Sequence, residues 1–505
     1  MTKEAQQLPT HYGSISPSTP VYQQLESDSS DQSHNNNNHH QTNLYNCGAP
    51  LLIHDLKENI KEEIEVIKEE MDTLAHAHFV LSEQAIVDTD RLHHIPAAGT
   101  ATIPSEVANM TKNLIGGGVL SLSGGIALYA NSPTAIVSAI LWVVLLGAVF
   151  GYFCLLIGKA CDMSLSGTYR ECWERTVGHR GGLGVAVAST VDPLIGIFAN
   201  ASILSQSLQL ILQGIDIHLN VTECLLLITF LALLPLCLMK NLDALAPFSA
   251  LGMASVLCAL GCMTFRYLDG SYLPDGQFYN DIPINMRPSF GTSSRPFSMD
   301  ALPFVCMVYT SFDMHYNSPR FYAELKDASI PRFGQVVGYS FGITAAIYFS
   351  IAAVGFLTFG ANSDSYILNN YSTRDSLATL SRITIGLCSL VSYPLNFIGV
   401  RDNCLDILGI TDEVDTDAKL NLFTILLLSI MTLASCFVTD LGLINSAGGG
   451  ATATFVCFVF PGLMFREAMK KHGRGPKWES SFATTLMILG AVMGCVGVYV
   501  STALA

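Results

Sequence analysis

The segment Lys112–Gly125, KNLIGGGVLSLSGG, places five glycines and a lysine in a stretch that is otherwise apolar enough to enter a membrane. Glycine inside a helix costs roughly 0.5–1 kcal/mol relative to alanine, so this composition favours a local interruption of the helix. The backbone groups freed by an interruption are tolerated at membrane depth only where they line a cavity. Close packing of helices through small residues is the alternative explanation.

The composition indicates a membrane protein. The 505-residue chain is 50% hydrophobic and 13% charged, whereas soluble domains carry roughly 25% charged residues. From Thr102 onward, the chain contains apolar segments that reach the roughly 20 residues needed to cross a bilayer. We predict eleven of them, near residues 104–130, 134–158, 182–213, 221–239, 244–266, 299–325, 333–359, 376–400, 419–438, 443–465 and 481–503.

The sixth segment carries a second interruption. It reads MDALPFVCMVYTSFDMHYNSPRFYAELK, in which polar residues and Pro319 divide an apolar helix. Proline kinks a helix, and the polar cluster would be costly against lipid. Because segments one and six are an odd number of helices apart, a five-helix repeat would begin again on the opposite face of the membrane. Paired interruptions of this kind are typical of the central binding site of a transporter.

The expected fold is therefore an all-α membrane protein with eleven transmembrane helices. It contains a 5+5 inverted repeat with helices 1 and 6 broken, plus one extra C-terminal helix. Residues 101–505 form the transmembrane transporter domain. Residues 1–100 hold fifteen acidic against five basic residues, and their polar composition predicts a disordered acidic tail. Apolar residues at helical spacing near 54–75 predict one short amphipathic helix within that tail.

The orientation follows from the basic residues of the connections. With a cytosolic N-terminus, most lysines and arginines of the connections fall in the cytosol, and only Arg266, Arg287, Arg295 and Arg374 lie on the other side. Two glycosylation sequons, NVT at Asn220 and NYS at Asn370, also fall on that non-cytosolic side. Near the N-terminus, YGSI and YQQL resemble tyrosine-type sorting signals, which suggests a sorting adaptor or regulatory partner for the tail.

Three motifs resemble the amino acid/auxin permease family, part of the amino acid–polyamine–organocation superfamily. NMTKNLIGGGVLSL (109–122) is similar to the family's first helix, HYNSPRFYAELKD (315–327) to the second half of its sixth, and SLVSYPLNFIGVRD (389–402) to the end of its eighth. The resemblance covers roughly Thr102 to Ala503 and extends to vacuolar-type and sodium-coupled neutral amino acid transporters. It implies the inverted-repeat fold and amino acid transport coupled to sodium or protons.

In such a transporter, the helix-1 interruption would hold the substrate carboxylate through backbone and hydroxyl donors, aided by the positive end of a half-helix. The helix-6 interruption would face the amino group and the side chain of the substrate. The residues expected to bind substrate are Gly116, Gly117, Gly118, Ser121, Phe312 and Asp313. Asp313 could instead cap the resumed half-helix.

The candidates for ion coupling are Lys112, Asp192, His315, Ser389 and Ser392. A structural hydrogen bond would equally explain His315, and a kink at Pro193 would equally explain Asp192. The resemblance implies sodium-binding hydroxyls at the two serines. Sodium-coupled members tend to have asparagine where this chain has Lys112, and an ammonium there would disfavour another cation. Lys112 could carry the coupling proton, or its long side chain could reach back to the membrane interface.

We expect a secondary active amino acid transporter, coupled to H+ and alternatively to Na+, that works as a symporter around a site between helices 1, 3, 6 and 8. The alternative is an amino acid receptor that signals through the tail. The expected membrane is a vacuolar or lysosomal type of endomembrane or the plasma membrane. We find no catalytic constellation or phosphate loop, and most of the fourteen cysteines lie in apolar runs without metal-binding spacing. The sequence therefore predicts no enzyme, metal site, cofactor or nucleic-acid partner, and membrane lipid as its surroundings.

Overall fold

A computed structural model of the protein describes residues 99–179, 181–239, 249–408, 410, 416–472 and 476–504. These described residues form one compact unit. Residues 1–98 of the predicted tail, with the amphipathic helix near 54–75 and both tyrosine signals, lie outside the described residues.

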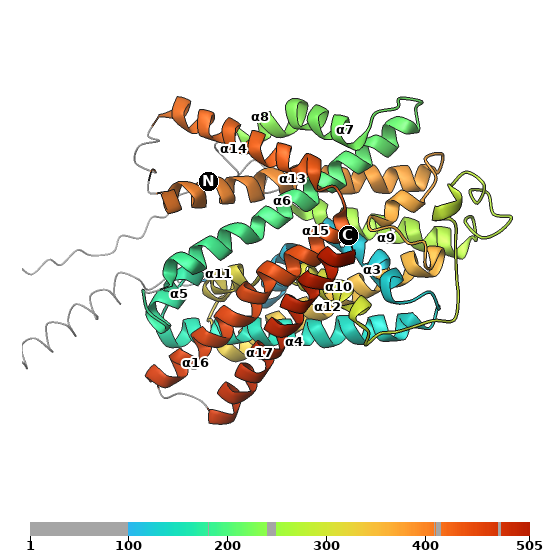
Figure 1. The fold of residues 1–505 in the computed structure, drawn as a ribbon. Coiled ribbons are helices and arrows are strands. Elements are labelled where there is room, and N and C mark those ends of the chain that lie inside the picture. The colour runs from blue at the N-terminus through green and yellow to red at the C-terminus, as the bar shows by residue number, and fades with distance from the viewer. Residues whose placement is uncertain are drawn as a thin grey trace, which may run out of the picture. The chain divides into compact units, whose positions relative to one another are not determined.

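All regular elements in the described ranges are helical, apart from isolated β-bridges (Figure 1). In chain order they are α2 (Ile103–Leu114), η1 (Gly117–Ser121), α3 (Leu122–Tyr129), α4 (Ala135–Ser164), α5 (Tyr169–Thr176), α6 (Gly182–Gln213), α7 (Val221–Ile228), η2 (Thr229–Leu233), α8 (Leu234–Cys237), α9 (Ser249–Leu268), η5 (Ile284–Met286), η6 (Met299–Ala301), α10 (Leu302–Ser311), η7 (His315–Asn317), α11 (Ser318–Glu324), α12 (Ile330–Phe359), η8 (Ile367–Asn370), α13 (Ser376–Leu408), α14 (Asp417–Phe437), α15 (Leu441–Gly448), η10 (Gly449–Val459), α16 (Phe460–His472) and α17 (Lys477–Leu504).

Seven of the described helices are long and apolar enough to cross a membrane. They are α4, α6, α12, α13, α14, the continuous run from α15 to α16, and α17. Shorter apolar helices cover Gly117–Tyr129, Val221–Cys237 and Gly252–Leu268. Each predicted apolar segment overlaps one of the observed helices or helix runs. The prediction of an all-helical, multi-span membrane protein is confirmed, while the count of eleven crossings and the inverted repeat stay predictions.

The surface of the bundle is apolar where it would contact lipid. On α14, the side chains of Leu422, Leu426, Ile430 and Leu433 are all more than half exposed. Their spacing of three and four residues places them on one face of the helix. An exposed apolar stripe of this length would be unfavourable in water, so the natural surroundings of this face are lipid chains.

Both predicted helix interruptions are present. The first helix stops at Leu114, and Ile115 and Gly116 take extended backbone conformations before the chain resumes as η1 and α3. The sixth predicted segment stops at Ser311, and the chain leaves the helical conformation around Met314 before η7 and α11. The long helices hold these interrupted segments between them, since α12 packs against α2 and α4 and α6 packs along α13.

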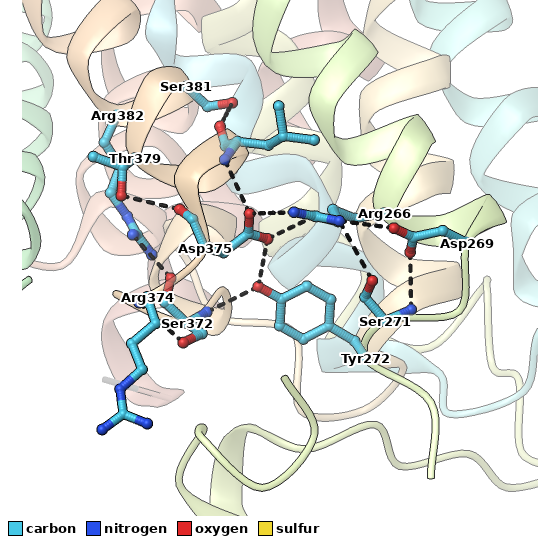
Figure 2. A network of polar contacts seen from close by, with 11 residues as sticks. Arg266, Asp269, Ser271, Tyr272, Ser372, Arg374, Asp375, Thr379, Ser381 and Arg382 are labelled. Carbon is cyan, nitrogen blue, oxygen red and sulfur yellow. Dashed lines mark hydrogen bonds and ion pairs between the residues drawn. The ribbon is translucent and has the colours of Figure 1, made fainter. Parts of the chain in front are cut away.

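A polar network joins α9 to the start of α13 at one end of the bundle (Figure 2). The buried Asp375 carboxylate accepts two hydrogen bonds from Arg266, at 2.8 and 2.9 Å, and one from the Tyr272 hydroxyl at 2.9 Å. The fully buried Arg382 donates to the carbonyls of Leu368 and Tyr371 in the η8 connection. The network therefore fixes the η8 connection between two helices, and we call this end of the bundle the η8 end.

The ion pair between Arg266 and Asp269 in this network resists acid. Partial burial alone would raise the pKa of Asp269, but hydrogen bonds from Ser271 and the nearby Arg266 guanidinium hold that pKa below its ordinary value. Burial raises the pKa of Tyr272, so its hydroxyl keeps the proton that it donates to Asp375. Because the pKa of Asp269 is lowered in the folded protein, its contribution to stability is present above about pH 4 and is lost as the pH falls through the lowered pKa.

We predict that Asp375→Asn destabilises the transmembrane domain by about 2–4 kcal/mol, because it leaves the Arg266 guanidinium without its bidentate partner in a largely buried position. Thermal unfolding of the purified protein measures the effect. Asp281→Asn is the matched control, since Asp281 pairs at 3.6 Å with an Arg374 side chain that is 80% exposed. Equal melting temperatures for the two variants would contradict the structural role of the network.

Candidate functional site

A cavity of about 540 Å³ lies where the two interrupted helices meet. Its walls come from α2 and η1, from α6, from the α10–α11 interruption, from α13 and from η10. The predicted site residues in its lining are Lys112, Gly116, Gly117, Gly118, Asp192, Asp313 and Ser392. Four segments that are distant in sequence, the predicted helices 1, 3, 6 and 8, thus contribute to one cavity.

Figure 1 shows α5 at one end of the bundle. The cavity extends toward this end. Its lining runs from the interruptions to the exposed residues Asn109, Asn113 and Arg320 of α2 and α11. A second cavity, of about 610 Å³, shares Asn113 and Arg320 with the first and continues to Tyr169 and Arg170 of α5. The two cavities form a path from the interruptions to the α5 end.

Toward the η8 end, hydrogen-bonded side chains separate the cavity from the surface. Gln206 of α6 accepts from Asn369 at 2.7 Å and donates to the Thr439 carbonyl at 3.0 Å. Ser207, one residue further along α6, bonds to the Tyr366 hydroxyl at 2.7 Å. This layer links α6 to the η8 connection and to the start of α15, so the site is closed on this side.

The Tyr348 hydroxyl of α12 joins the two interruptions. It lies 2.5 Å from the Leu114 carbonyl at the end of α2 and 2.7 Å from the Ser311 carbonyl at the end of α10. Both carbonyls have lost their helical partners, and the Tyr348 side chain is fully buried. One hydroxyl group therefore serves the freed backbone acceptors of both broken helices.

Asn445 of α15 plays a matching part beside η1. Its Nδ2 donates to the Gly118 carbonyl at 3.2 Å and to Ser121 Oγ at 3.0 Å, and Ser121 Oγ itself donates to the Gly118 carbonyl at 2.8 Å. The Asn445 carbonyl accepts from Thr310 Oγ1 of α10 at 2.5 Å. Ser121 is fully buried, so the structure puts it in the support of the interruption rather than in the cavity lining.

The three glycines of the interruption differ in the space around them. A Cβ atom on Gly117 would lie 2.6 Å from Ile203 Cδ1, and one on Gly118 would lie 3.3 Å from Asn445 Nδ2. A Cβ atom on Gly116 would meet nothing within 4 Å. The close approach of η1 to α6 and α15 thus requires glycine most strongly at Gly117, while Gly116 borders open cavity.

Two predicted site residues lie behind the cavity wall. The ring of Phe312 is fully buried and stacks on Phe341 at 5.8 Å, and it also packs against Tyr348 and Gly147. The Phe312 ring does not line the cavity in this structure, because the interruption turns it toward α4 and α12, and a contact between Phe312 and the substrate stays a prediction.

The His315 ring is likewise buried behind the wall. Its Nε2 bonds to the Phe150 carbonyl of α4 at 2.9 Å, and its Nδ1 has no partner among the described residues. This geometry corresponds to the structural alternative for His315, a hydrogen bond that holds the start of η7 against α4.

Acidic side chains meet in the cavity wall. Asp192 of α6 and Asp313 at the α10–η7 interruption both line the cavity. Thr452 Oγ1 of η10 lies 3.1 Å from Asp192 Oδ1, and Cys457 Sγ donates to Asp313 Oδ1 at 3.1 Å. Ligand-type atoms of Asp313, His315 and Cys457 come within 4.8 Å of one another. Because the Cys457 thiol uses its proton in the bond to Asp313, we describe this group as a hydrogen-bonded set and assign no metal to it.

Lys112 and the serines of α13 share the cavity with these acids. Lys112 is half-buried, and no ion pair of its ammonium group is present within the described residues. Ser392 lines the cavity, whereas Ser389 is buried beside Gly117, where a Cβ atom would lie 3.7 Å from Ser389 Oγ. A cationic group, two acidic groups and hydroxyl groups are thus gathered around freed backbone.

The two glycosylation candidates differ in access. Asn220 is exposed and caps α7 through its bond with the backbone N–H of Glu223. Asn370 is fully buried, and its amide donates to the carbonyls of Met286 and Asn362 and accepts from the backbone N–H of Asp364. The Asn370 side chain is therefore enclosed in this structure, whereas the Asn220 side chain is accessible.

The sequence analysis missed Tyr348, Asn445 and Thr452. A signal for the last two was present in segment ten, where LINSAGGGATATF places an asparagine, two threonines and three glycines inside an apolar run. In the structure, a Cβ atom on Gly449 would lie 2.2 Å from the Cys306 carbonyl oxygen of α10, so this run packs backbone to backbone. Tyr348 carried no signal, because a single tyrosine in an apolar helix is common.

Comparisons with known proteins agree with this arrangement. A family model described as "Transmembrane amino acid transporter protein" matches residues 99–504. The "Putative sodium-coupled neutral amino acid transporter 11" of Danio rerio is 22% identical, with 80% of this chain and 87% of that protein covered. The "Amino acid transporter AVT6E" of Arabidopsis thaliana is 24% identical, with 82% and 85% covered. A solved structure, "Inward facing conformation of Mhp1", shares the fold at a TM-score of 0.51 and 12% identity, with 81% of this chain and 90% of that chain covered.

We predict that Tyr348→Phe destabilises the protein by about 1–3 kcal/mol and slows any transport, because two carbonyl groups at the interruptions lose their donor. Tyr339→Phe on the same helix is the matched control, since Tyr339 is 63% exposed. Thermal unfolding in detergent and uptake into proteoliposomes check both effects. If the two variants unfold and transport alike, the bridge between the interruptions has no energetic role.

Proposed function

The chain belongs to the transmembrane amino acid transporter family, and we propose that it is a secondary active amino acid transporter driven by protons. It is a multi-pass membrane protein, and its relatives are transporters rather than enzymes. The observation that carries the proposal is the cavity at the junction of the two interrupted helices, because freed peptide groups at that depth are suited to a small polar ligand.

The proposed substrate is an α-amino acid bound between the two interruptions. Its carboxylate would accept hydrogen bonds from the backbone N–H groups around Gly116, Gly117 and Gly118, whose cavity side is open. Its ammonium group would lie toward Asp313, the acidic group at the second interruption. This orientation pairs each charged end of the zwitterion with a group of opposite polarity.

The direction of opening supports alternating access. The cavity is open toward α5 and is closed at the η8 end by the layer around Gln206. The connections at the α5 end carry most of the basic residues, which favours a cytosolic location for that end. We therefore propose a cytosolic N-terminus and an inward-open conformation, with exposed Asn220 as the glycosylation site on the opposite side.

Lys112 supports protons rather than sodium as the coupling ion. Its side chain lines the same cavity as Ser392, so its ammonium group would supply a positive charge near the hydroxyls that the family resemblance links to sodium. A second cation would be repelled there. Sodium coupling is the alternative, since the names of several relatives include it.

The experiment that tests the function is uptake of a panel of labelled amino acids into proteoliposomes that contain the full chain. A transporter should exchange at least one neutral amino acid in counterflow and accumulate it when the outside is acidified. Failure of every amino acid in counterflow would refute the proposal and would favour a receptor that signals through residues 1–98.

We predict that replacement of sodium by a large organic cation leaves wild-type uptake unchanged, whereas collapse of the pH gradient reduces it. Lys112→Asn removes the fixed positive charge and should give uptake that sodium stimulates. The measurement is the initial rate of uptake with and without sodium. A wild type that requires sodium would contradict this role, and Lys112 would then be an anchor at the membrane interface.

We predict that Gly118→Leu abolishes transport while the protein stays folded, because the added side chain meets Asn445 and fills the cavity beside the interruption. Gly116→Ala is the matched control and should lose much less activity, since its Cβ atom borders open space. Uptake is measured together with the size-exclusion profile of each variant. Normal transport by Gly118→Leu would show that η1 does not bind the substrate.

A further inference from the structure

Two carboxyl groups from different helices meet in the cavity wall. Asp192 lies in α6 beside Pro193, and Asp313 lies at the α10–η7 interruption. Both side chains line the cavity and both contact η10, Asp192 through Thr452 and Asp313 through Cys457. Two ionised carboxylates in one cavity wall repel each other, and the repulsion is strong where water is scarce. One proton on the pair removes this repulsion and leaves the pair with one negative charge.

The hydrogen bonds around the pair stabilise a negative charge on Asp313 better than one on Asp192. The Cys457 thiol donates to Asp313 at 3.1 Å. The Thr452 hydroxyl lies 3.1 Å from Asp192, but its single proton is also shared with the Gly448 carbonyl at 3.0 Å. Asp313 is thus the better stabilised anion, and the proton belongs mainly to Asp192.

No ion-pair partner among the described side chains balances the negative charge of Asp192 or Asp313. None of the ion pairs among the described side chains includes Asp192 or Asp313. Several other titratable side chains face the pair or share its cavity. They are Tyr169 of α5, His315 and Tyr316 of η7, Cys457 of η10, Lys112 of α2, Tyr348 of α12, Cys388 of α13, and Arg320 and Glu324 of α11, which form an ion pair with each other. The tyrosines and the thiols are neutral near pH 7, so the cation that balances the Asp313 charge has to come from the cavity.

We propose that Asp192 and Asp313 form one composite cation site that takes the coupling proton on Asp192 and the substrate ammonium group on Asp313. The proposal rests on the transport function proposed above and names the chemistry of its coupling. The proton reaches Asp192 from the aqueous cavity, and no covalent bond other than O–H is made or broken. The site takes one proton for each amino acid.

The charge of the site explains why the two cations travel together. With a proton but no substrate, the pair carries one negative charge, and with both it is neutral. With an ammonium group but no proton, it again carries one negative charge. Because an unbalanced charge is costly in the membrane interior, the fully loaded site is the one best able to close around the substrate.

The test uses the full chain in proteoliposomes, with labelled L-alanine and L-glutamine as probes. For the wild type, the KM in counterflow should rise by up to about tenfold per pH unit above the pKa of the pair, because one proton is linked to binding. In Asp192→Asn, which mimics the protonated carboxyl, counterflow should stay measurable with a KM that no longer depends on pH between 5 and 8. Accumulation driven by a pH gradient should be lost in this variant.

Asp313→Asn should instead raise the KM at least about tenfold at every pH, because the ammonium group loses its anionic partner. Asp162→Asn is the matched control for both variants, since Asp162 lies outside both cavities and bonds to the Tyr322 hydroxyl at 2.6 Å. This control should keep pH-driven accumulation.

Gradient-driven accumulation by Asp192→Asn would overturn the composite site while leaving the transport function intact. A wild type without counterflow would refute the transport function itself, so the two failures are distinguishable. If Asp192→Asn does not fold, a pH-sensitive dye inside wild-type vesicles measures how many protons enter with each amino acid. One proton entering per amino acid supports the site, and substrate entry without acidification overturns it.

Discussion

The constraint on which the rest of the structure depends is the need of freed backbone groups for hydrogen-bond partners inside a membrane. Water is absent from the hydrocarbon region, so each carbonyl at a helix interruption requires a donor from the protein or a ligand. Tyr348 serves the carbonyls of Leu114 and Ser311, and Asn445 serves that of Gly118. Both donors lie outside the broken helices, on α12 and α15, and both of these helices pack on η1. The backbone that remains is open to the cavity and is the part available to a substrate.

The two ends of the bundle are built differently, and the difference suits alternating access. At the η8 end, buried charges and capped carbonyls link α9, the η8 connection and α13 through Asp375 and Arg382 (Figure 2). At the α5 end, the segment before α2 bonds to the end of α11, with Ala101 donating to the Glu324 carbonyl at 3.0 Å and accepting from Lys326 at 2.8 Å. This bridge ties the two half-helices that border the open cavity. A movement that closes the cavity from this side therefore has to displace α2 and α11 together.

The sequence could predict the depth of the site but not the direction of its side chains. The glycines after Lys112 and the polar run around Asp313 each mark where a helix stops, and both interruptions occur at those positions. The direction in which Phe312 and His315 point depends on the backbone angles of only a few residues at the interruption, and spacing along the chain does not determine these angles. Both rings turn toward α4, where Gly147 leaves space for Phe312 and the Phe150 carbonyl accepts a hydrogen bond from His315 Nε2.

Tyr348 and Asn445 were beyond sequence reasoning for a related reason. Their partners are backbone carbonyls, which leave no trace in residue identity, and they lie 234 and 327 positions away in the chain. Asp192 and Asp313 were identified separately, because each is an acidic residue inside an apolar segment. Only the packing of α6 and of the second interruption against η10 brings them to one cavity wall. Each carboxylate alone would be costly to bury in a membrane. When the two share one proton, the pair carries one negative charge instead of two. The same interruption that frees backbone groups for a substrate therefore also creates the place where a proton can be held.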